Sequence, residues 1–154
     1  MSERFIATPG LLRLAYNSLS ARLFAAIARS GFEDLRPAHG NVMEHLSYED
    51  GLRLTDLAGR AGMTAQSMGE LVDDLVSKGY VERRPDRADR RAKRIHLTAR
   101  GSETVGAAGR AMREVERDLT ELLGEPGYRQ LRQTLETVLA ALPAEKDTGQ
   151  RHAA

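Results

Sequence analysis

Apolar residues recur at intervals of three and four along most of the chain, the spacing that places them on one face of an α-helix. Near the N-terminus this spacing predicts a helix over about residues 8–30, ended by Gly31. Its apolar face is formed by Leu12, Tyr16, Leu19, Leu23 and Ile27. A second helix is expected after Pro37, because proline is well tolerated in the first helical turn. Its apolar face consists of Val42, Met43 and Leu46.

Two closely spaced helices follow in the middle of the chain. The first is expected to begin at Thr55, whose hydroxyl can cap free backbone N–H groups, and to end at Gly62. Thr64 is a second capping residue and opens a longer helix that ends at Gly79. The apolar stripe of this longer helix contains Met68, Leu71, Val72, Leu75 and Val76. Two helices joined by a short turn that contains glycine are typical of a helix-turn-helix.

After Gly79 the apolar period changes to two, which predicts strands over about residues 80–84 and 94–98. Seven basic and two acidic residues lie between Arg83 and Arg94, so this segment carries +5 in a chain whose total is only +1. A helix-turn-helix followed by a hairpin with a cationic tip is typical of a winged helix. Such a tip favours an anionic partner such as nucleic acid, although a solvated charged loop has the same pattern.

Thr98 is expected to cap a long helix, and a further helix is expected after Pro126. Apolar residues in both alternate spacings of three and four, as in a coiled-coil seam. The two helices could pack on a core of their own. A winged helix needs little help to fold, however, so we expect these helices and the first one to pack against a second copy of the protein. The expected interface residues are Leu12, Leu19, Met112, Val115, Leu119, Leu122, Leu131, Leu135 and Val138.

Composition excludes several classes of function. The chain has no cysteine, so a disulfide, a zinc-thiolate site and a thiol redox switch are excluded. The longest purely apolar run has six residues, and the N-terminus lacks the apolar stretch of a signal peptide, so we expect no membrane segment and a cytoplasmic location. No glycine-rich phosphate loop, His-Glu-x-x-His or Gly-x-Ser-x-Gly motif is present, so we expect neither an enzyme nor a bound cofactor or metal.

The run from Met63 to Gly101 resembles the recognition helix and wing of the MarR family of bacterial transcription regulators. In that family the wing carries Asp-x-Arg followed at a fixed distance by Leu-Thr-x-x-Gly. The matching residues here are Asp89, Arg91, Leu97, Thr98 and Gly101. The order of the helices is similar over nearly the whole chain up to Pro143.

The resemblance and the helix pattern together imply a mainly α fold with a small two- or three-stranded β wing. The expected parts are an N-terminal dimerisation helix (1–35), a winged helix-turn-helix (36–98), C-terminal dimerisation helices (99–143) and a flexible tail (144–154). The resemblance implies a homodimer that binds a pseudo-palindromic operator in double-stranded DNA, as a repressor released by a small aromatic or phenolic effector. The alternative is a winged helix used for protein or RNA contacts, without operator recognition.

The start of the Thr64 helix is the expected site of base recognition. Its first turn has free N–H groups and a partial positive charge that can meet a phosphate. Gln66 can bond an adenine edge, Ser67 can contact a base or a phosphate, and the Ala65 methyl group can touch thymine. The expected contact residues are Thr64, Ala65, Gln66, Ser67 and Glu70. Gln66 could equally be a solvent-facing amide.

In the wing, Arg91 is expected in the minor groove, whose negative potential attracts guanidinium groups. Asp89 is expected to hold a wing arginine through paired hydrogen bonds, or else to be a simple turn residue. The full wing set is Arg84, Arg87, Asp89, Arg90, Arg91 and Lys93, and its other basic members are expected to contact phosphates. Tyr16 and His39 could line an effector pocket, or could be ordinary half-buried core residues.

Overall fold

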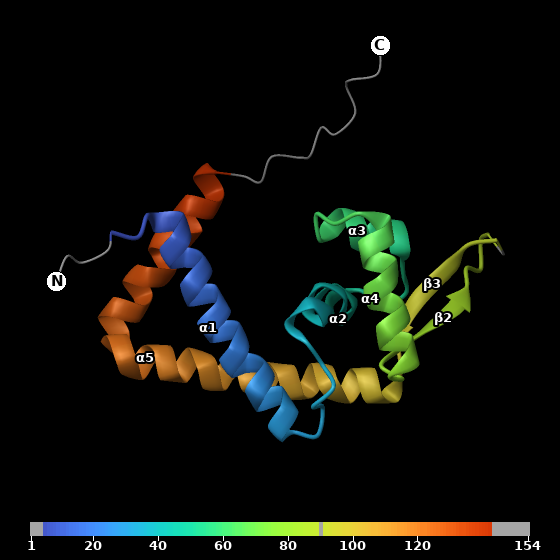
Figure 1. Cartoon of the computed structure of the whole chain (residues 1–154), viewed down its shortest axis with the longest axis horizontal. Coiled ribbons are helices and arrows are strands. Elements are labelled where there is room, and N and C mark those ends of the chain that lie inside the picture. The colour runs from blue at the N-terminus through green and yellow to red at the C-terminus, as the bar shows by residue number, and fades with distance from the viewer. Residues whose placement is uncertain (1–4, 90, 143–154) are drawn as a thin grey trace, which may run out of the picture. The chain divides into compact units, whose positions relative to one another are not determined.

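The computed structural model describes residues 5–89 and 91–142, which form helices and one small antiparallel sheet (Figure 1). The chain divides into two compact units, of which the first ends at Val115 and the second begins at Glu116. The elements are α1 (Thr8–Arg29), the 3-10 turn η1 (Pro37–His39), α2 (Gly40–Tyr48), β1 (Leu52–Arg53), α3 (Leu54–Arg60), α4 (Ala65–Ser77), β2 (Val81–Pro85), β3 (Lys93–Leu97) and α5 (Ala99–Ala141). Over the described ranges, no helix combines the length and apolar character that crossing a bilayer requires.

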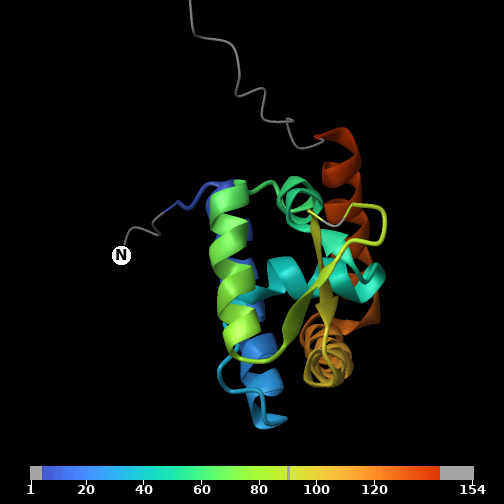
Figure 2. The ribbon, with the colours of Figure 1, turned by 90° about the vertical axis from the view of Figure 1, so that its right-hand side faces the viewer.

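Helices α3 and α4 and the β2–β3 hairpin form the predicted winged helix (Figure 2). The sheet has the order β1-β3-β2, so the two-residue strand β1 adds a third strand beside β3. Leu52 pairs with Ile95, and Val81 pairs with Leu97. The fold class expected from the sequence, mainly helical with a small β wing, is confirmed.

One hydrophobic core holds α2, α3, α4 and the sheet together. Its most deeply buried residues are Val42, Leu46, Leu52, Leu57, Met68, Val72, Leu75, Tyr80, Val81 and Ile95. Burying an aliphatic or aromatic side chain of this size stabilises the folded state by about 1.5–3 kcal/mol. The apolar stripes predicted for α2 and α4 therefore do face inward, at Val42 and Leu46 and at Met68, Val72 and Leu75.

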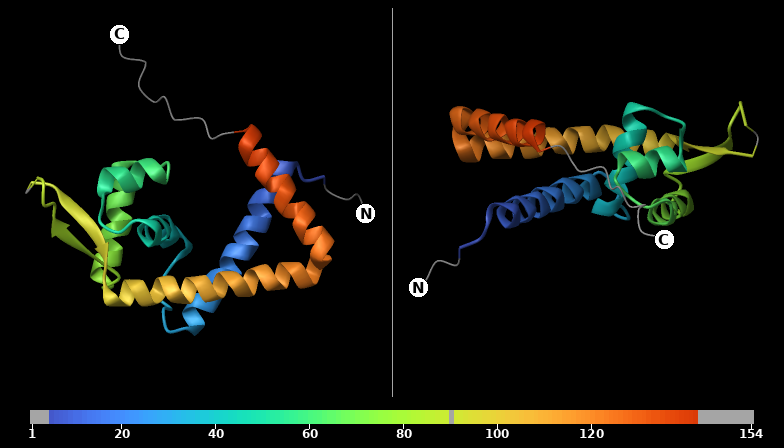
Figure 3. Two further views of the ribbon diagram at one scale, coloured as in Figure 1. Left: turned by 180° about the vertical axis from the view of Figure 1, so that it is seen from behind. Right: turned by 90° about the horizontal axis from the view of Figure 1, so that it is seen from above.

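A second, smaller core lies where the C-terminal end of α1 meets the first part of α5 (Figure 3). Ala26 and Ile27 of α1 pack there against Ala111 of α5. An ion pair between Arg29 and Glu114, with an N–O distance of 2.9 Å, lies beside this contact. The first unit thus contains α1 as well as the winged helix, and the C-terminal part of α1 packs on the start of α5.

Two of the three predicted helix caps are confirmed. The Ser67 N–H donates to Oγ1 of Thr64 at 3.1 Å, and the Gly101 N–H donates to Oγ1 of Thr98 at 3.1 Å. The prediction that Thr55 caps α3 is wrong. Strand β1 runs directly into α3, so Arg53 is the last extended residue, and its N–H donates to the Asp56 carboxylate at 3.3 Å. Asp56 therefore binds the N–H of the residue before the helix, whereas Thr55 was expected to cap N–H groups within its first turn.

Helix α5 is interrupted at Gly124, as expected from a separate helix after Pro126. Gly124 has φ 68° and ψ 159°, a conformation that residues with a side chain rarely adopt. Pro126 then lies in the first turn of the second helical segment, where its missing N–H would have no helical partner. Within the second unit, Glu116 accepts a hydrogen bond from the Tyr128 hydroxyl and forms an ion pair with Arg132.

We expect Gly101→Ala to destabilise the winged helix. A Cβ atom at this position would lie 2.1 Å from the backbone carbonyl oxygen of Tyr80, so β2 and α5 would have to move apart. Overpacking of this kind costs about 1–3 kcal/mol, which urea unfolding measures.

Gly106→Ala in the same helix is the matched control. The nearest atom to its new Cβ would be the flexible end of Arg110 at 3.7 Å, so the gain in helix propensity should stabilise the protein by up to about 1 kcal/mol. Equal stability of the two variants would contradict the steric argument.

Candidate nucleic-acid interface

The N-terminal end of α4 presents a small polar face to solvent. All five residues predicted to contact DNA there, Thr64, Ala65, Gln66, Ser67 and Glu70, are exposed. The Thr64 hydroxyl donates to the Ser67 hydroxyl oxygen at 3.0 Å, in addition to accepting the Ser67 N–H. The cap therefore fixes the first turn of the helix and leaves the Gln66 side chain pointing away from the core.

The wing is a second exposed and strongly basic surface. Arg84, Arg87, Asp89, Arg91 and Lys93 are all exposed, while Arg90 lies outside the described residues. Arg84 forms an ion pair with Glu82 at 2.5 Å, and Arg83 forms one with Asp73 of α4 at 2.7 Å. Among the described residues, no ion pair involves the side chains of Arg87, Arg91 or Lys93. The positive charge that is free for a ligand is thus concentrated at the tip.

A buried carboxylate, Asp86, fixes the base of the wing. Its Oδ2 accepts hydrogen bonds from Arg53 Nε at 3.0 Å, Arg53 Nη2 at 2.8 Å and Arg94 Nε at 2.9 Å. Its Oδ1 accepts the Ala88 N–H at 2.9 Å. Asp86 is only 3% exposed, and the Ala88 N–H together with the Arg53 guanidinium holds the pKa of its carboxyl well below the ordinary range. Because Arg53 precedes α3, this carboxylate ties the wing to the helix-turn-helix.

The sequence analysis did not predict the structural role of Asp86. It counted this residue only as one of the two acids in the basic segment 83–94. The register of the hairpin gives the signal that could have found it. Arg84 pairs with Arg94 and Pro85 with Lys93, so Asp86 leaves β2 where Arg94 can reach back to it. Arg53 comes from a distant part of the chain, and no local pattern predicts its contact.

Asp89 has a different role from the one expected first. Its Oδ1 accepts the backbone N–H of Arg91 at 3.0 Å, and its carbonyl oxygen accepts the Ala92 N–H at 2.9 Å. Among the described residues, the wing carboxylates that hold arginine side chains are Asp86 and Glu82. Asp89 thus shapes the turn that presents Arg91, which agrees with the alternative interpretation of this residue.

The two residues predicted for an effector pocket lie in different surroundings. Tyr16 of α1 is 67% exposed. His39 is completely buried, and both of its ring nitrogens have partners within the fold. The pocket stays a prediction, and the imidazole of His39 is already engaged in internal hydrogen bonds.

Most of the predicted interface residues leave apolar surface uncovered. The exposed members of this set are Leu12, Met112, Leu122, Leu131, Leu135 and Val138. Leu19 and Leu119 are half-buried. Val115 is buried within its own chain, so little of it remains for a partner.

We expect Asp86→Asn to loosen the wing. The amide has a similar shape, but it removes the negative charge between Arg53 and Arg94, so backbone amides of β2 and β3 should exchange hydrogen faster. The contribution of the wild-type carboxylate is complete above its unfolded pKa of about 3.9 and is lost as the pH falls toward its lowered folded pKa. Hydrogen exchange followed by mass spectrometry measures both effects.

Asp89→Asn is the matched control, because it removes the same charge from an exposed turn. We expect faster exchange only near Arg91 in this variant. Equal effects of the two substitutions along β2 and β3 would show that Asp86 does not fix the wing.

Known proteins share both the sequence pattern and the fold. A family model described as the MarR family matches residues 33–92. The HTH-type transcriptional regulator PetP of Rhodobacter capsulatus is 30% identical over 106 residues, which are 69% of this chain and 64% of the relative. The matched region is thus less than two thirds of that relative's length.

Two solved structures extend the likeness to most of the chain. The reduced form of MarR from E. coli has a TM-score of 0.78 at 21% identity and covers 89% of this chain and 99% of its own. The transcriptional repressor CouR, bound to a 23-mer DNA duplex, has a TM-score of 0.71 at 26% identity and covers 88% of this chain and 91% of its own. The family model, the relative and the fold thus agree: residues 33–92 match the MarR family, and most of the chain shares the fold of MarR from E. coli.

Proposed function

We propose that this protein is a transcriptional regulator that binds a specific sequence in double-stranded DNA as a homodimer. The observation that carries the proposal is the placement of two surfaces. The N-terminal end of α4 and the tip of the β2–β3 wing point toward the same end of the winged helix (Figures 1 and 2). One surface is small and polar and the other is cationic, as reading base edges and holding phosphates require.

In this proposal α4 lies in the major groove. Gln66 bonds an adenine edge through its amide, and Ser67 contacts a base or a phosphate. Thr64 orders the first turn, while Ala65 and Glu70 border the contact. The exposure of all five side chains supports this assignment.

The wing lies along the neighbouring minor groove. Arg91 enters the groove, and Arg87, Arg90 and Lys93 contact phosphates. Arg84 has a smaller share of the binding because its guanidinium is paired with Glu82. Asp89 orders the turn that carries Arg91.

Pairing of two chains would place two such surfaces on a pseudo-palindromic operator. The exposed apolar residues at the start of α1 and at the end of α5 support a second copy as the partner. CouR is a transcriptional repressor whose solved structure holds a DNA duplex, and on that resemblance we also propose repression. A small aromatic or phenolic effector would release the DNA, and the protein would act in the cytoplasm, where the chromosome lies.

Gln66→Ala and Arg91→Ala should affect binding in different ways. Loss of a base-reading amide should reduce the difference in binding free energy between operator and random duplex by about 1–3 kcal/mol. Loss of a groove arginine should weaken binding to both duplexes and make log K fall less steeply with log salt, by about 0.9 per phosphate contact. Fluorescence anisotropy at several salt concentrations measures both quantities.

The two variants serve as each other's controls. An unchanged operator preference in Gln66→Ala would remove that residue from the reading face. An unchanged affinity in Arg91→Ala would remove it from the groove.

Leu12→Asp should convert the dimer into monomers. Leu12 is exposed in the chain, and a carboxylate at that position would be buried without a partner in the proposed interface. Light scattering measures the molar mass.

Asn17→Asp adds the same charge to α1 five residues later, about 140° around the helix, and should remain dimeric. A dimeric Leu12→Asp variant would place the interface elsewhere.

A further inference from the structure

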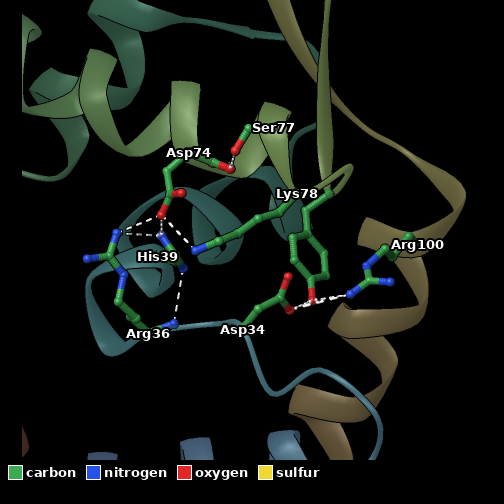
Figure 4. Close-up of polar contacts among 8 residues, drawn as sticks. Asp34, Arg36, His39, Asp74, Ser77, Lys78 and Arg100 are labelled. Atoms are coloured by element: carbon green, nitrogen blue, oxygen red, sulfur yellow. Dashed lines mark hydrogen bonds and ion pairs between the residues drawn. The ribbon is translucent and has the colours of Figure 1, made fainter.

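The buried imidazole of His39 connects the segment between α1 and α2 to the C-terminal half of α4 (Figure 4). His39 ends η1, and its Nε2 lies 2.8 Å from Oδ2 of Asp74. Asp74 lies seven residues after Ser67 in α4, or about 10 Å along the helix axis. The contact therefore lies on the same helix as the predicted base-reading residues, about two turns from Ser67.

The hydrogen bonds define where the single proton of the neutral ring lies. Nδ1 accepts the backbone N–H of Arg36 at 3.0 Å, so Nδ1 carries no proton. The proton is then on Nε2 and is donated to Asp74. The neutral ring of His39 thus makes both hydrogen bonds at once, as acceptor from the Arg36 N–H and as donor to Asp74.

Two cations form ion pairs with the carboxylate that His39 contacts. Arg36 Nη2 lies 2.6 Å and Lys78 Nζ 2.8 Å from the same Oδ2 of Asp74. Hydrogen bonds from Lys78 and then from Arg36 hold the pKa of Asp74 well below its ordinary range. Among the described residues, Arg36, Asp74 and Lys78 are the ionisable groups that face the ring.

A second proton on the ring would break this arrangement. It would place an N–H on Nδ1 opposite the Arg36 N–H, so two donors would face each other at a fully buried position. Burial lowers the pKa of His39 below its ordinary value of about 6.5, the hydrogen bond to Asp74 raises it, and the charges of Lys78 and Arg36 lower it further. Protonation in mildly acidic solution therefore works against the buried position of the ring, and the ring contacts Asp74 of α4 only from that position.

We propose that His39 is a positioning residue for DNA recognition, which as a neutral donor holds α4 in its reading orientation and on protonation releases it. The inference rests on the proposed function. It adds that the preference for the operator over other duplexes decreases as the pH falls.

A second contact from the same segment keeps the fold intact when His39 is protonated. The Tyr80 hydroxyl donates to Asp34 at 2.5 Å, and Arg100 Nη2 donates to the Tyr80 hydroxyl at 2.9 Å (Figure 4). The guanidinium of Arg100 also lies over the Tyr80 ring, 4.6 Å from its centre. The hydrogen bond from Tyr80 lowers the pKa of Asp34, and burial raises the pKa of Tyr80, so neither group titrates near neutral pH. Release of His39 therefore changes an orientation and leaves the core in place.

The proposed release of α4 and the general effect of acid change DNA binding in opposite directions. Added positive charge on a protein strengthens its binding to any duplex, whatever the sequence. Release of α4 weakens base reading and lowers the ratio of operator affinity to random-duplex affinity. The ratio of the two affinities therefore separates the two effects.

The test compares two duplexes by fluorescence anisotropy between about pH 8 and about pH 5.5. One duplex is selected by the protein from a random pool at the higher pH, and the other is a scrambled duplex of equal length and composition. For the wild type we expect the affinity ratio to fall by about tenfold across this range, the value of one lost base contact. For His39→Gln we expect a ratio that is constant within about twofold, because the amide still donates to Asp74 and does not titrate.

Two further variants make the test specific. Lys78→Gln removes one of the cations that oppose protonation of the ring, so the midpoint of the fall should move to higher pH, and this holds even if His39→Gln does not fold. His96→Gln removes a histidine from the wing and should keep the wild-type fall in the ratio. Circular dichroism at each pH follows the folded state.

The outcomes separate the inference from the function on which it rests. A wild type without preference for any duplex at any pH overturns both. A preference that does not change with pH overturns the inference alone, as does an equal fall in His39→Gln or a loss of helical signal that accompanies the fall.

Discussion

The close contact between the start of β2 and the start of α5 is the constraint on which the first unit depends. The Thr98 hydroxyl donates to the Gly79 carbonyl oxygen at 2.6 Å, and the Thr98 N–H donates to the Tyr80 carbonyl oxygen at 3.1 Å. Gly101 lies against that same carbonyl and leaves no room for a side chain. The end of α4, the start of β2 and the start of α5 therefore meet where residues 79–80 contact residues 98–101. This contact explains why the Leu-Thr-x-x-Gly spacing accompanies the fold.

Two carboxylates hold the two exposed surfaces that we propose for DNA binding, the wing and the start of α4. Asp86 receives cations from the β1–α3 junction and from β3, and it fixes the wing. Asp74 receives Arg36, His39 and Lys78, and it fixes α4. Each carboxylate joins segments that are far apart in the chain, and neither is among the residues expected to contact DNA. The two surfaces are thus held by separate anchors on a shared core.

The sequence predicted what depends on local periodicity. The stripe of α4, the strands of the wing, the caps at Thr64 and Thr98 and the break before Pro126 follow from neighbours within four residues. The cap of α3 was wrong because the short strand β1 shifts the helix start, and nothing near Thr55 shows that strand. The partners of Asp86 and His39 were missed because Arg53 and Asp74 lie 33 and 35 residues away, respectively. Such contacts are set by the packing of the core, which a single sequence does not display.

The internal ion pairs of the wing limit how strongly it attracts DNA in general. Of the seven basic residues in the segment, Arg83, Arg84 and Arg94 are paired with acids of the same chain. Fewer free cations mean fewer counterions released on bulk chromosomal DNA and shorter stays at the many sites that are not the target. In the proposed function, these internal ion pairs reduce the share of the protein that is held on DNA outside the operator.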